Sequence, residues 1–249
     1  MRLRQIALAS LRLDDVARQL NRVFGLKVAY VDPKVGRYGL RNVVMPCGDG
    51  FLEICEPTTT DASIARFLAR RGDAGYMIIL QTADARAEQD RVAQMGVRVV
   101  ETIDRPVYYC AHFHPADFGG VLVSFDQQRT TDDHLAAFGD WMPAGPEWRA
   151  ARTQDVGDMA SVTVGSGDAY AMARHWSDLL GRPLDAADDR SIRLDKGAIR
   201  FADAASVSIT AIDMKMRDPA RALRSAREIG LDVSDDGVLI AGVRFRPKM

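Results

Sequence analysis

The chain has 249 residues, of which 47% are hydrophobic and 27% are charged, and its formal net charge is -1. These values are typical of a globular protein with one large domain or two smaller ones. No long basic block occurs, which argues against nucleic acid and anionic membranes as partners. No segment approaches the roughly 18 consecutive apolar residues of a membrane span. The apolar run that ends at Ala9 is shorter than the roughly 7 to 15 residues of a signal-peptide core. We therefore expect neither a membrane span nor a signal peptide.

The first module of the chain predicts a strand at 5–10 and a helix at 14–25. From Val16 onward, apolar residues recur at i, i+4, i+7 and i+8, the pattern of a helix that packs on a core, and Gly25 ends the helix. Further strands, rich in β-branched and aromatic residues, are expected at 26–31, 40–46 and 50–57. The order is strand, helix, strand, strand, strand.

The second module repeats this order. A strand at 76–83 precedes a helix at 84–96, which begins at Asp84, a natural N-cap, and ends at Gly96. Three more strands are expected at 97–103, 107–115 and 120–126.

Residues 127–157 are polar, contain Pro143 and Pro146, and form the natural linker. Trp141 and Trp148 within the linker would be unusual in a flexible tether, because aromatic side chains bury large areas. We therefore expect the linker to pack back onto a domain.

Beyond the linker the same order occurs twice more. The helix at 168–181 repeats the apolar spacing of the first helix, and the helix at 218–230 begins at Asp218 with Pro219 in its first position. The strands of these two modules are expected at 161–166, 182–185, 191–195, 197–203, 209–216, 231–234, 237–241 and 242–247. The chain thus predicts an α+β fold of tandem βαβββ modules, two per domain. The expected domains are 1–126 and 158–249.

Three short motifs resemble the vicinal oxygen chelate superfamily, which contains glyoxalases, extradiol dioxygenases, methylmalonyl-CoA epimerase and bleomycin-resistance proteins. QIALASLRLDD is similar to the family's first-strand motif, and FLEICEP is similar to its fourth-strand motif. HPADFGGVLVSFD resembles the ending of a module, with a Gly-Gly turn and a last strand. The resemblance implies that paired modules curve their strands into cupped mixed sheets with helices outside. The reaction would then take place inside the cup.

The family usually holds a divalent metal through histidine and glutamate side chains, on the first and last strand of each module. Carried over to this sequence, these positions fall on Gln5, Glu53, Met77 and Ser124, with Tyr76 replacing Met77 if the register moves by one. One carboxylate, an amide, a thioether and a hydroxyl are a poor set of metal ligands. We therefore expect no metal and no other cofactor.

The matching positions of the second half are about Ser161, Arg200, Ala211 and Arg246, which cannot hold a metal in this way. The two arginines would instead present positive charge, to an anion or to carboxylates across the domain.

His112 and His114 lie on one expected strand, and alternation puts both side chains on the same face. Such a pair can chelate a metal, but the family places no ligands on this strand. We favour His114 at the mouth of the pocket or bonded to the following turn, and His112 as a polar residue of the sheet.

Glu53 lies between Leu52 and Ile54, so alternation turns it away from the face that those two residues share. If its own face lines the cup, its pKa would be raised and it would be a candidate general base. The alternative is an acid paired with an arginine or hydrogen-bonded to Gln5. The expected substrate contacts are Gln5, Met77, Ser124, His114, His112, Phe51 and Tyr108.

Two classes of function remain open. The first is a lyase or isomerase of the glyoxalase or epimerase type, which moves a proton next to a carbonyl group. The second is a metal-free binding protein of the bleomycin-resistance type. A metal-dependent dioxygenase is a third alternative. The expected partner is a small molecule, the expected state a monomer or homodimer, and the three widely spaced cysteines suit the reducing cytoplasm.

Overall fold

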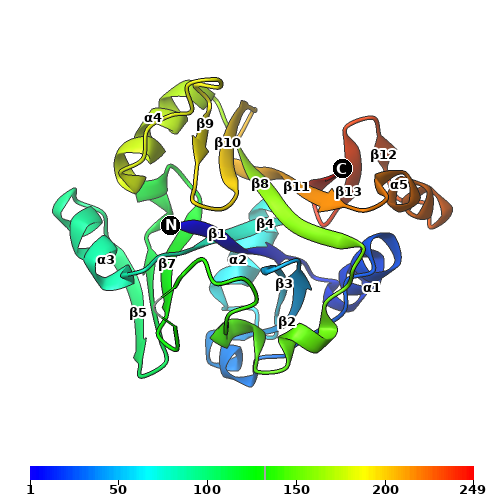
Figure 1. Ribbon diagram of the computed structural model, residues 1–249, viewed down its shortest axis with the longest axis horizontal. Coiled ribbons are helices and arrows are strands. Elements are labelled where there is room, and N and C mark those ends of the chain that lie inside the picture. The colour runs from blue at the N-terminus through cyan, green and yellow to red at the C-terminus, as the bar shows by residue number, and fades with distance from the viewer. Residues whose placement is uncertain (132) are drawn as a thin grey trace. The chain divides into compact units, whose positions relative to one another are not determined.

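The computed structural model describes residues 1–131 and 133–249. The first module contains β1 (Arg2–Ala9), α1 (Leu13–Phe24), β2 (Leu40–Cys47) and β3 (Gly50–Pro57). The helix α2 (Ser63–Arg71) leads to the second module, which contains β4 (Ala74–Gln81), α3 (Ala85–Gln94), β5 (Val99–Arg105), β6 (Tyr108–Phe113) and β7 (Leu122–Gln128). The third contains β8 (Val156–Ser166), α4 (Ala169–Leu180), β9 (Ser191–Arg193) and β10 (Ala198–Asp203). The fourth contains β11 (Ser208–Met216), α5 (Pro219–Glu228), β12 (Val233–Ser234), β13 (Gly237–Ile240) and β14 (Val243–Lys248) (Figure 1).

The predicted α+β fold of repeated modules is therefore confirmed, with one difference. In the first and third modules the strand expected directly after the helix is reduced to a single bridge, Tyr30 with Val44 and Asp185 with Asp188. Pro33 begins a short 3-10 turn that leads the chain away from the sheet after Tyr30, and Pro183 has no N–H for a strand ladder.

The helix ends follow the predicted chemistry. Asp84, Asp168 and Asp218 each accept a hydrogen bond from the backbone N–H three residues later, at 3.0, 2.9 and 2.8 Å. Gly25 and Gly181 end their helices in the left-handed conformation, with φ of 71° and 61°.

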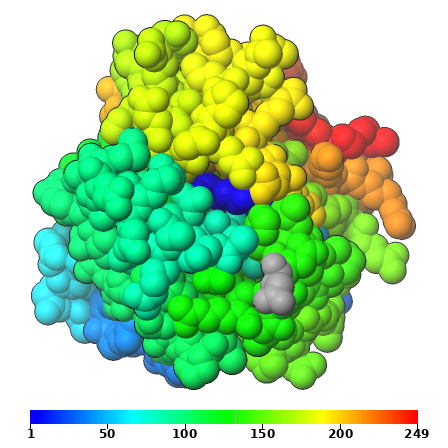
Figure 2. All heavy atoms as spheres, turned by 60° about the vertical axis from the view of Figure 1, so that its left-hand side comes forward, coloured from blue at the N-terminus to red at the C-terminus, as the bar shows by residue number. Residues whose placement is uncertain are grey.

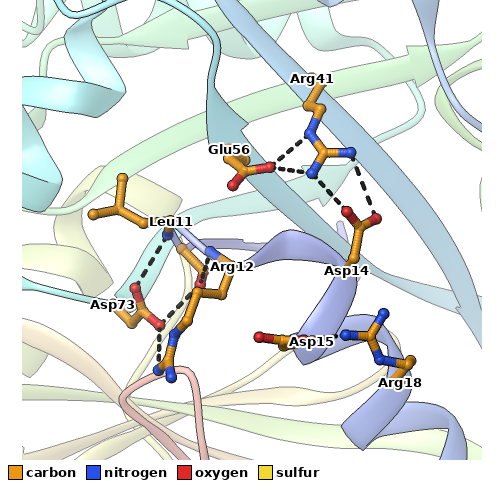
Figure 3. Close-up of polar contacts among 9 residues, drawn as sticks. Leu11, Arg12, Asp14, Asp15, Arg18, Arg41, Glu56 and Asp73 are labelled. Atoms are coloured by element: carbon orange, nitrogen blue, oxygen red, sulfur yellow. Dashed lines mark hydrogen bonds and ion pairs between the residues drawn. The ribbon is translucent and has the colours of Figure 1, made fainter.

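The N-terminus of α1 uses a different arrangement, which Figure 3 shows. Asp73, which comes from the turn between α2 and β4, accepts hydrogen bonds from the Leu11 N–H at 3.3 Å and from the Ser10 hydroxyl at 2.8 Å. Ser10 in turn accepts from the Arg12 N–H at 3.0 Å. Asp73 thus fixes the segment that enters α1, and Ser10 accepts the N–H of the N-cap residue Arg12.

The residues group into two compact units, and each takes segments from both halves of the chain. Unit 1 consists of Met1–Gln5, Met77–Met142 and Ser161–Ile209, and unit 2 consists of Ile6–Tyr76, Pro143–Ala160 and Thr210–Met249. The predicted domain boundaries at 126 and 158 stay a prediction.

Unit 1 holds the strand sets β5-β6-β7-β4 and β9-β10-β8, both mixed in direction. Aromatic side chains meet Trp176 of α4, since its ring centroid lies 5.3 Å from Phe118, in the 3-10 turn between β6 and β7, and 5.6 Å from Phe201 of β10. Phe113 and Phe125 continue this cluster on β6 and β7. The cluster marks the strand face that the helices cover.

In Figure 2 the N-terminal end of β1, in dark blue, lies beside the yellow segment of unit 1 that contains β9 and β10. Two backbone hydrogen bonds of 3.0 Å make this contact, from Leu3 to Lys196 and from Asp195 to Met1.

Unit 2 places α1 next to α5, as Figure 1 shows. Phe24 at the end of α1 lies 5.6 Å from Phe245 of β14 between ring centroids, in a buried core. None of the described helices is long and apolar enough to cross a membrane.

The linker packs back into the fold, as predicted, because its residues up to Met142 belong to unit 1, those from Pro143 belong to unit 2, and its two tryptophans are buried. Trp141 belongs to unit 1 and is 1% exposed, and Trp148 belongs to unit 2 and is fully buried.

Candidate functional site

The strand register of unit 1 brings several predicted site residues to one face. His112 lies opposite Ser124 in the β6–β7 pair, and Met77 lies opposite Leu122 in the β4–β7 pair. Alternation then places Met77, His112, Ser124 and Tyr108 on the same side of the sheet. This is the side away from the aromatic cluster around Trp176. We call it the Ser124 face of unit 1.

A buried hydrogen-bond network occupies the centre of this face. The hydroxyls of Ser124 and Tyr108 each donate a hydrogen bond to one carboxylate oxygen of Asp126, and all three residues are buried. Burial, together with the charge of Asp126, raises the pKa of Tyr108 well above its usual value. The Tyr108 phenol therefore keeps its proton at ordinary pH and donates it to the hydrogen bond with Asp126.

The edge of the Ser124 face carries an acid and an imidazole. Glu101 lies opposite His112 in the β5–β6 pair, and its Oε2 is 3.6 Å from Nδ1 of His112. Nε2 of the same imidazole is 3.6 Å from the Cys110 thiol. The side chains of His112 and Glu101 are 24% and 30% exposed, so both remain accessible from the solvent.

His114 lies beyond this face, at the turn that follows β6. Its Nδ1 accepts a hydrogen bond from the Ala116 N–H at 3.3 Å and lies 3.1 Å from the guanidinium of Arg98. Arg98 also binds Asp117, at 2.6 and 3.0 Å, and lowers the pKa of that carboxyl to about 2. The structure thus shows the bond to the turn that the sequence suggested for His114.

Gln5 contacts the linker. Its Oε1 accepts a hydrogen bond of 2.7 Å from the indole N–H of Trp141, and both side chains are 1% exposed. The Trp141 ring also meets Tyr108 edge to face at 5.8 Å and lies 5.1 Å from the guanidinium carbon of Arg4.

In unit 2, Glu53 and Phe51 share one face of β3, where Val44 lies opposite Glu53. Asn42, on the neighbouring strand β2, donates a hydrogen bond of 2.6 Å from its amide to Oε1 of Glu53. Glu53 is half-buried, while Val44 and Phe51 are buried. The ring of Phe51 meets Trp148 of the linker edge to face at 4.9 Å.

The charge of Glu53 contributes to the raised pKa values of Tyr76 and Cys55. Burial, with smaller contributions from Cys55 and Glu53, raises the pKa of Tyr76 to about 12. Burial and the same carboxylate raise the pKa of the Cys55 thiol well above its usual value. Burial of these two residues is the larger cause in both cases, and the carboxylate of Glu53 adds to it.

The four positions that would hold the family's metal do not fit a cation. The oxygen of Gln5 receives the Trp141 N–H, the hydroxyl of Ser124 donates to Asp126, and Met77 offers a thioether. Glu53 supplies the one strong ligand of the set. Within residues 1–131 and 133–249, no group of three or more His, Cys, Asp or Glu side chains gathers to hold a metal ion.

The corresponding positions of the second half are also unsuited to a metal. Arg200 binds Asp188 at 3.4 Å, and Arg246 binds Asp236 at 2.8 Å. Ser161 and Ala211, at the other two positions, are buried. The arginines face carboxylates within their own units, one of the two alternatives that the sequence left open.

Residues 2–125 match the model of the Glyoxalase/Bleomycin resistance protein/Dioxygenase superfamily, and through them the chain belongs to this superfamily. No curated protein matches the chain.

Several solved structures are similar to this chain, and the one that aligns with a TM-score above 0.5 shows the shared fold. A methylmalonyl-CoA epimerase variant of Streptomyces coelicolor, in complex with 2-nitronate-propionyl-CoA, is 25% identical and covers 51% of this chain and 97% of its own, with a TM-score of 0.47. The epimerase of Mycobacterium tuberculosis is 22% identical and covers 51% and 87%, with a TM-score of 0.47. A variant of 4-hydroxymandelate synthase from S. coelicolor is 14% identical and covers 92% of this chain and 75% of its own, with a TM-score of 0.71.

Sequence reasoning missed several polar residues of these faces. Asp126 lies two residues after Ser124, so alternation alone would have placed it on the same face. Glu101 and Asn42 had no such signal, because their contacts with His112 and Glu53 depend on which residues of two strands lie opposite each other.

Proposed function

We propose that the protein binds a small organic molecule and that Glu53 accepts a proton from a carbon atom next to a carbonyl group, without the metal that the superfamily usually employs. The observation that carries the proposal is the environment of Glu53. It is a half-buried carboxylate among buried apolar side chains, and Asn42 holds one of its oxygens at 2.6 Å.

Such an environment suits proton abstraction for two reasons. A carboxylate in an apolar region is less well solvated than one in water, which makes it a stronger base. The amide of Asn42 fixes the carboxylate plane, so the second oxygen keeps a defined direction. The first feature concerns the strength of Glu53 as a base and the second concerns the orientation of its carboxylate. Neither requires a metal.

The experiment has two stages. Thermal shift assays with propionyl-CoA, the glutathione hemithioacetal of methylglyoxal, and catechol identify the class of compound that stabilises the protein. The stabilising compound is then incubated in D2O, and incorporation of deuterium next to its carbonyl is followed by NMR.

Glu53→Gln keeps the size and the hydrogen bond from Asn42 but removes the base. We expect it to bind the stabilising compound within about threefold of wild type and to lose at least about a hundredfold in exchange rate. Glu56→Gln is the matched control, because Glu56 lies on the opposite face of β3 and pairs with Arg41. Exchange that persists in the Glu53 variant would contradict the proposal.

A second candidate is binding without turnover, of the bleomycin-resistance type. Its basis is the sequence prediction, since in the structure Trp141 and Trp148 cover Gln5 and Phe51, two of the predicted contact residues. Binding in the thermal shift assay without any deuterium incorporation in the wild-type protein would support this alternative. A dioxygenase reaction receives no support from the ligand set at Gln5, Glu53, Met77 and Ser124. A cytoplasmic location and a monomeric or homodimeric state stay predictions.

A further inference from the structure

The side chain of Trp141 lies in a site formed by Arg4, Gln5 and Tyr108, which we call the indole socket. Gln5 accepts the indole N–H at 2.7 Å, Tyr108 meets the ring edge to face at 5.8 Å, and the Arg4 guanidinium lies 5.1 Å from the ring. Both Gln5 and Trp141 are 1% exposed. All four residues belong to unit 1.

The indole socket recognises specific chemistry. An indole N–H can only donate a hydrogen bond, so the amide of Gln5 must turn its oxygen towards the ring. A guanidinium near an aromatic ring is attracted by the electrons of the ring face, and an edge-on phenol favours another ring over an aliphatic chain. The three contacts together select a flat aromatic ring that carries an N–H or O–H donor.

The segment that brings Trp141 into the indole socket has little regular structure. Trp141 precedes the short 3-10 turn Met142–Ala144 and lies in neither a helix nor a strand. The Arg4 guanidinium donates to the Gly139 carbonyl at 3.4 Å, and the Met142 N–H donates to Oε1 of Gln128 at 2.9 Å. Segments without regular structure open at lower free energy than the core of a sheet.

We propose that the indole socket is a binding site of unit 1 for an aromatic ring with a hydrogen-bond donor, of the indole or phenol type, and that Trp141 occupies it as an internal ligand until such a molecule replaces it. This site goes beyond the proton transfer proposed for Glu53, a residue that belongs to unit 2.

The first test uses Trp141→Ala, which empties the indole socket, with indole and 1-methylindole as probes. Calorimetry should show that the variant binds indole and that 1-methylindole, which lacks the donor, binds about tenfold more weakly. Trp176→Ala is the matched control, because Trp176 is an equally buried tryptophan of unit 1 that donates to the Phe118 carbonyl, away from Arg4 and Tyr108. Equal affinities for the two probes, or no binding of indole by a folded Trp141→Ala protein, would overturn the assignment of Gln5 as the recognising group.

The second test needs no destabilising substitution. Wild-type protein labelled with 5-fluorotryptophan is titrated with indole, and Trp141→Phe assigns the fluorine signal of Trp141. Addition of indole should move this signal towards its value in the unfolded chain and leave the signal of Trp176 unchanged. Wild type should bind more weakly than Trp141→Ala, because the tethered ring competes at an effective concentration in the millimolar range.

A Trp141 signal that stays unchanged up to the solubility limit of indole would show that the linker ring is a permanent part of the core, and the proposal would be wrong. This outcome leaves the role of Glu53 untouched, because the Glu53→Gln experiment measures a different property. Conversely, a failed exchange experiment does not affect the fluorine titration.

Discussion

The pKa of Tyr76 depends in part on Glu53, the candidate base, and it affects how the stability of the folded protein changes with pH. Burial, with repulsion from Cys55 and Glu53, raises its pKa from 10.0 to about 12. The folded protein therefore holds the phenol proton more tightly than the unfolded chain between these two values, so its stability must fall as the pH rises from about 10 to about 12. Below pH 10 the phenol is protonated in both states and has no such effect.

We therefore expect Tyr76→Phe to lose less stability than wild type over this alkaline range. The cysteines, whose pKa values are also raised by burial, are unchanged in the variant, so the difference between the two curves isolates Tyr76. Urea unfolding at several pH values between 8 and 11.5 measures it. Parallel curves would mean that burial does not raise the pKa of the Tyr76 phenol in the folded protein.

For single residues, the sequence predicted the strand face on which a side chain lies better than it predicted the hydrogen-bond partner of that side chain. The alternation of Leu52, Glu53 and Ile54 correctly indicated that Glu53 turns away from the face that its two neighbours share. The bond from Asn42 to Glu53 could not be predicted, because it requires the register between β2 and β3. The Ser124–Asp126–Tyr108 network likewise depends on β6 and β7 lying side by side.

Among the elements, the linker depends on a close backbone contact at the turn between β2 and β3. Gly48 has a φ of +68°, and a Cβ atom there would lie 2.1 Å from the carbonyl oxygen of Gly157. The guanidinium of Arg152 also donates to the Gly48 carbonyl at 3.0 Å. Any larger residue at position 48 must push the end of the linker away from this turn.

Gly48→Ala should therefore lower the free energy of unfolding by roughly 2 to 4 kcal/mol, which combines the strained backbone with the steric clash. Gly36→Ala is the control, since a Cβ atom at Gly36 would meet no described atom within 4 Å and the φ of this residue is not positive. Thermal or urea unfolding compares the two. A Gly48 variant as stable as the Gly36 variant would refute the close contact.

Helix ends and most strands were predictable because their sequence signals are local. Asp84 and Asp218 begin helices, and Gly25 and Gly181 end them, where the sequence placed these events. The strands expected at 26–31 and 182–185 are reduced to bridges, since β-branched and apolar residues alone do not ensure a neighbouring strand with which to pair.

At the scale of the whole molecule, the repeat predicted the fold but not how the modules combine. Unit 1 joins residues of the second and third modules, for example through Trp176 and Phe118, and unit 2 joins residues of the first and fourth, through Phe24 and Phe245. Four modules with one pattern of apolar residues offer similar surfaces, so the sequence pattern alone does not distinguish these pairings.

The central claim is that this member of the superfamily has lost the metal ligands of the fold and relies on its own hydrogen-bond donors and on Glu53. Elemental analysis of protein purified without chelator, followed by a Co²⁺ titration read by visible absorption, tests it most directly. We predict divalent metal far below one ion per chain and no Co²⁺ absorption band that depends on Glu53. One tightly bound divalent ion per chain, lost in Glu53→Gln but retained in Glu56→Gln, would contradict the account.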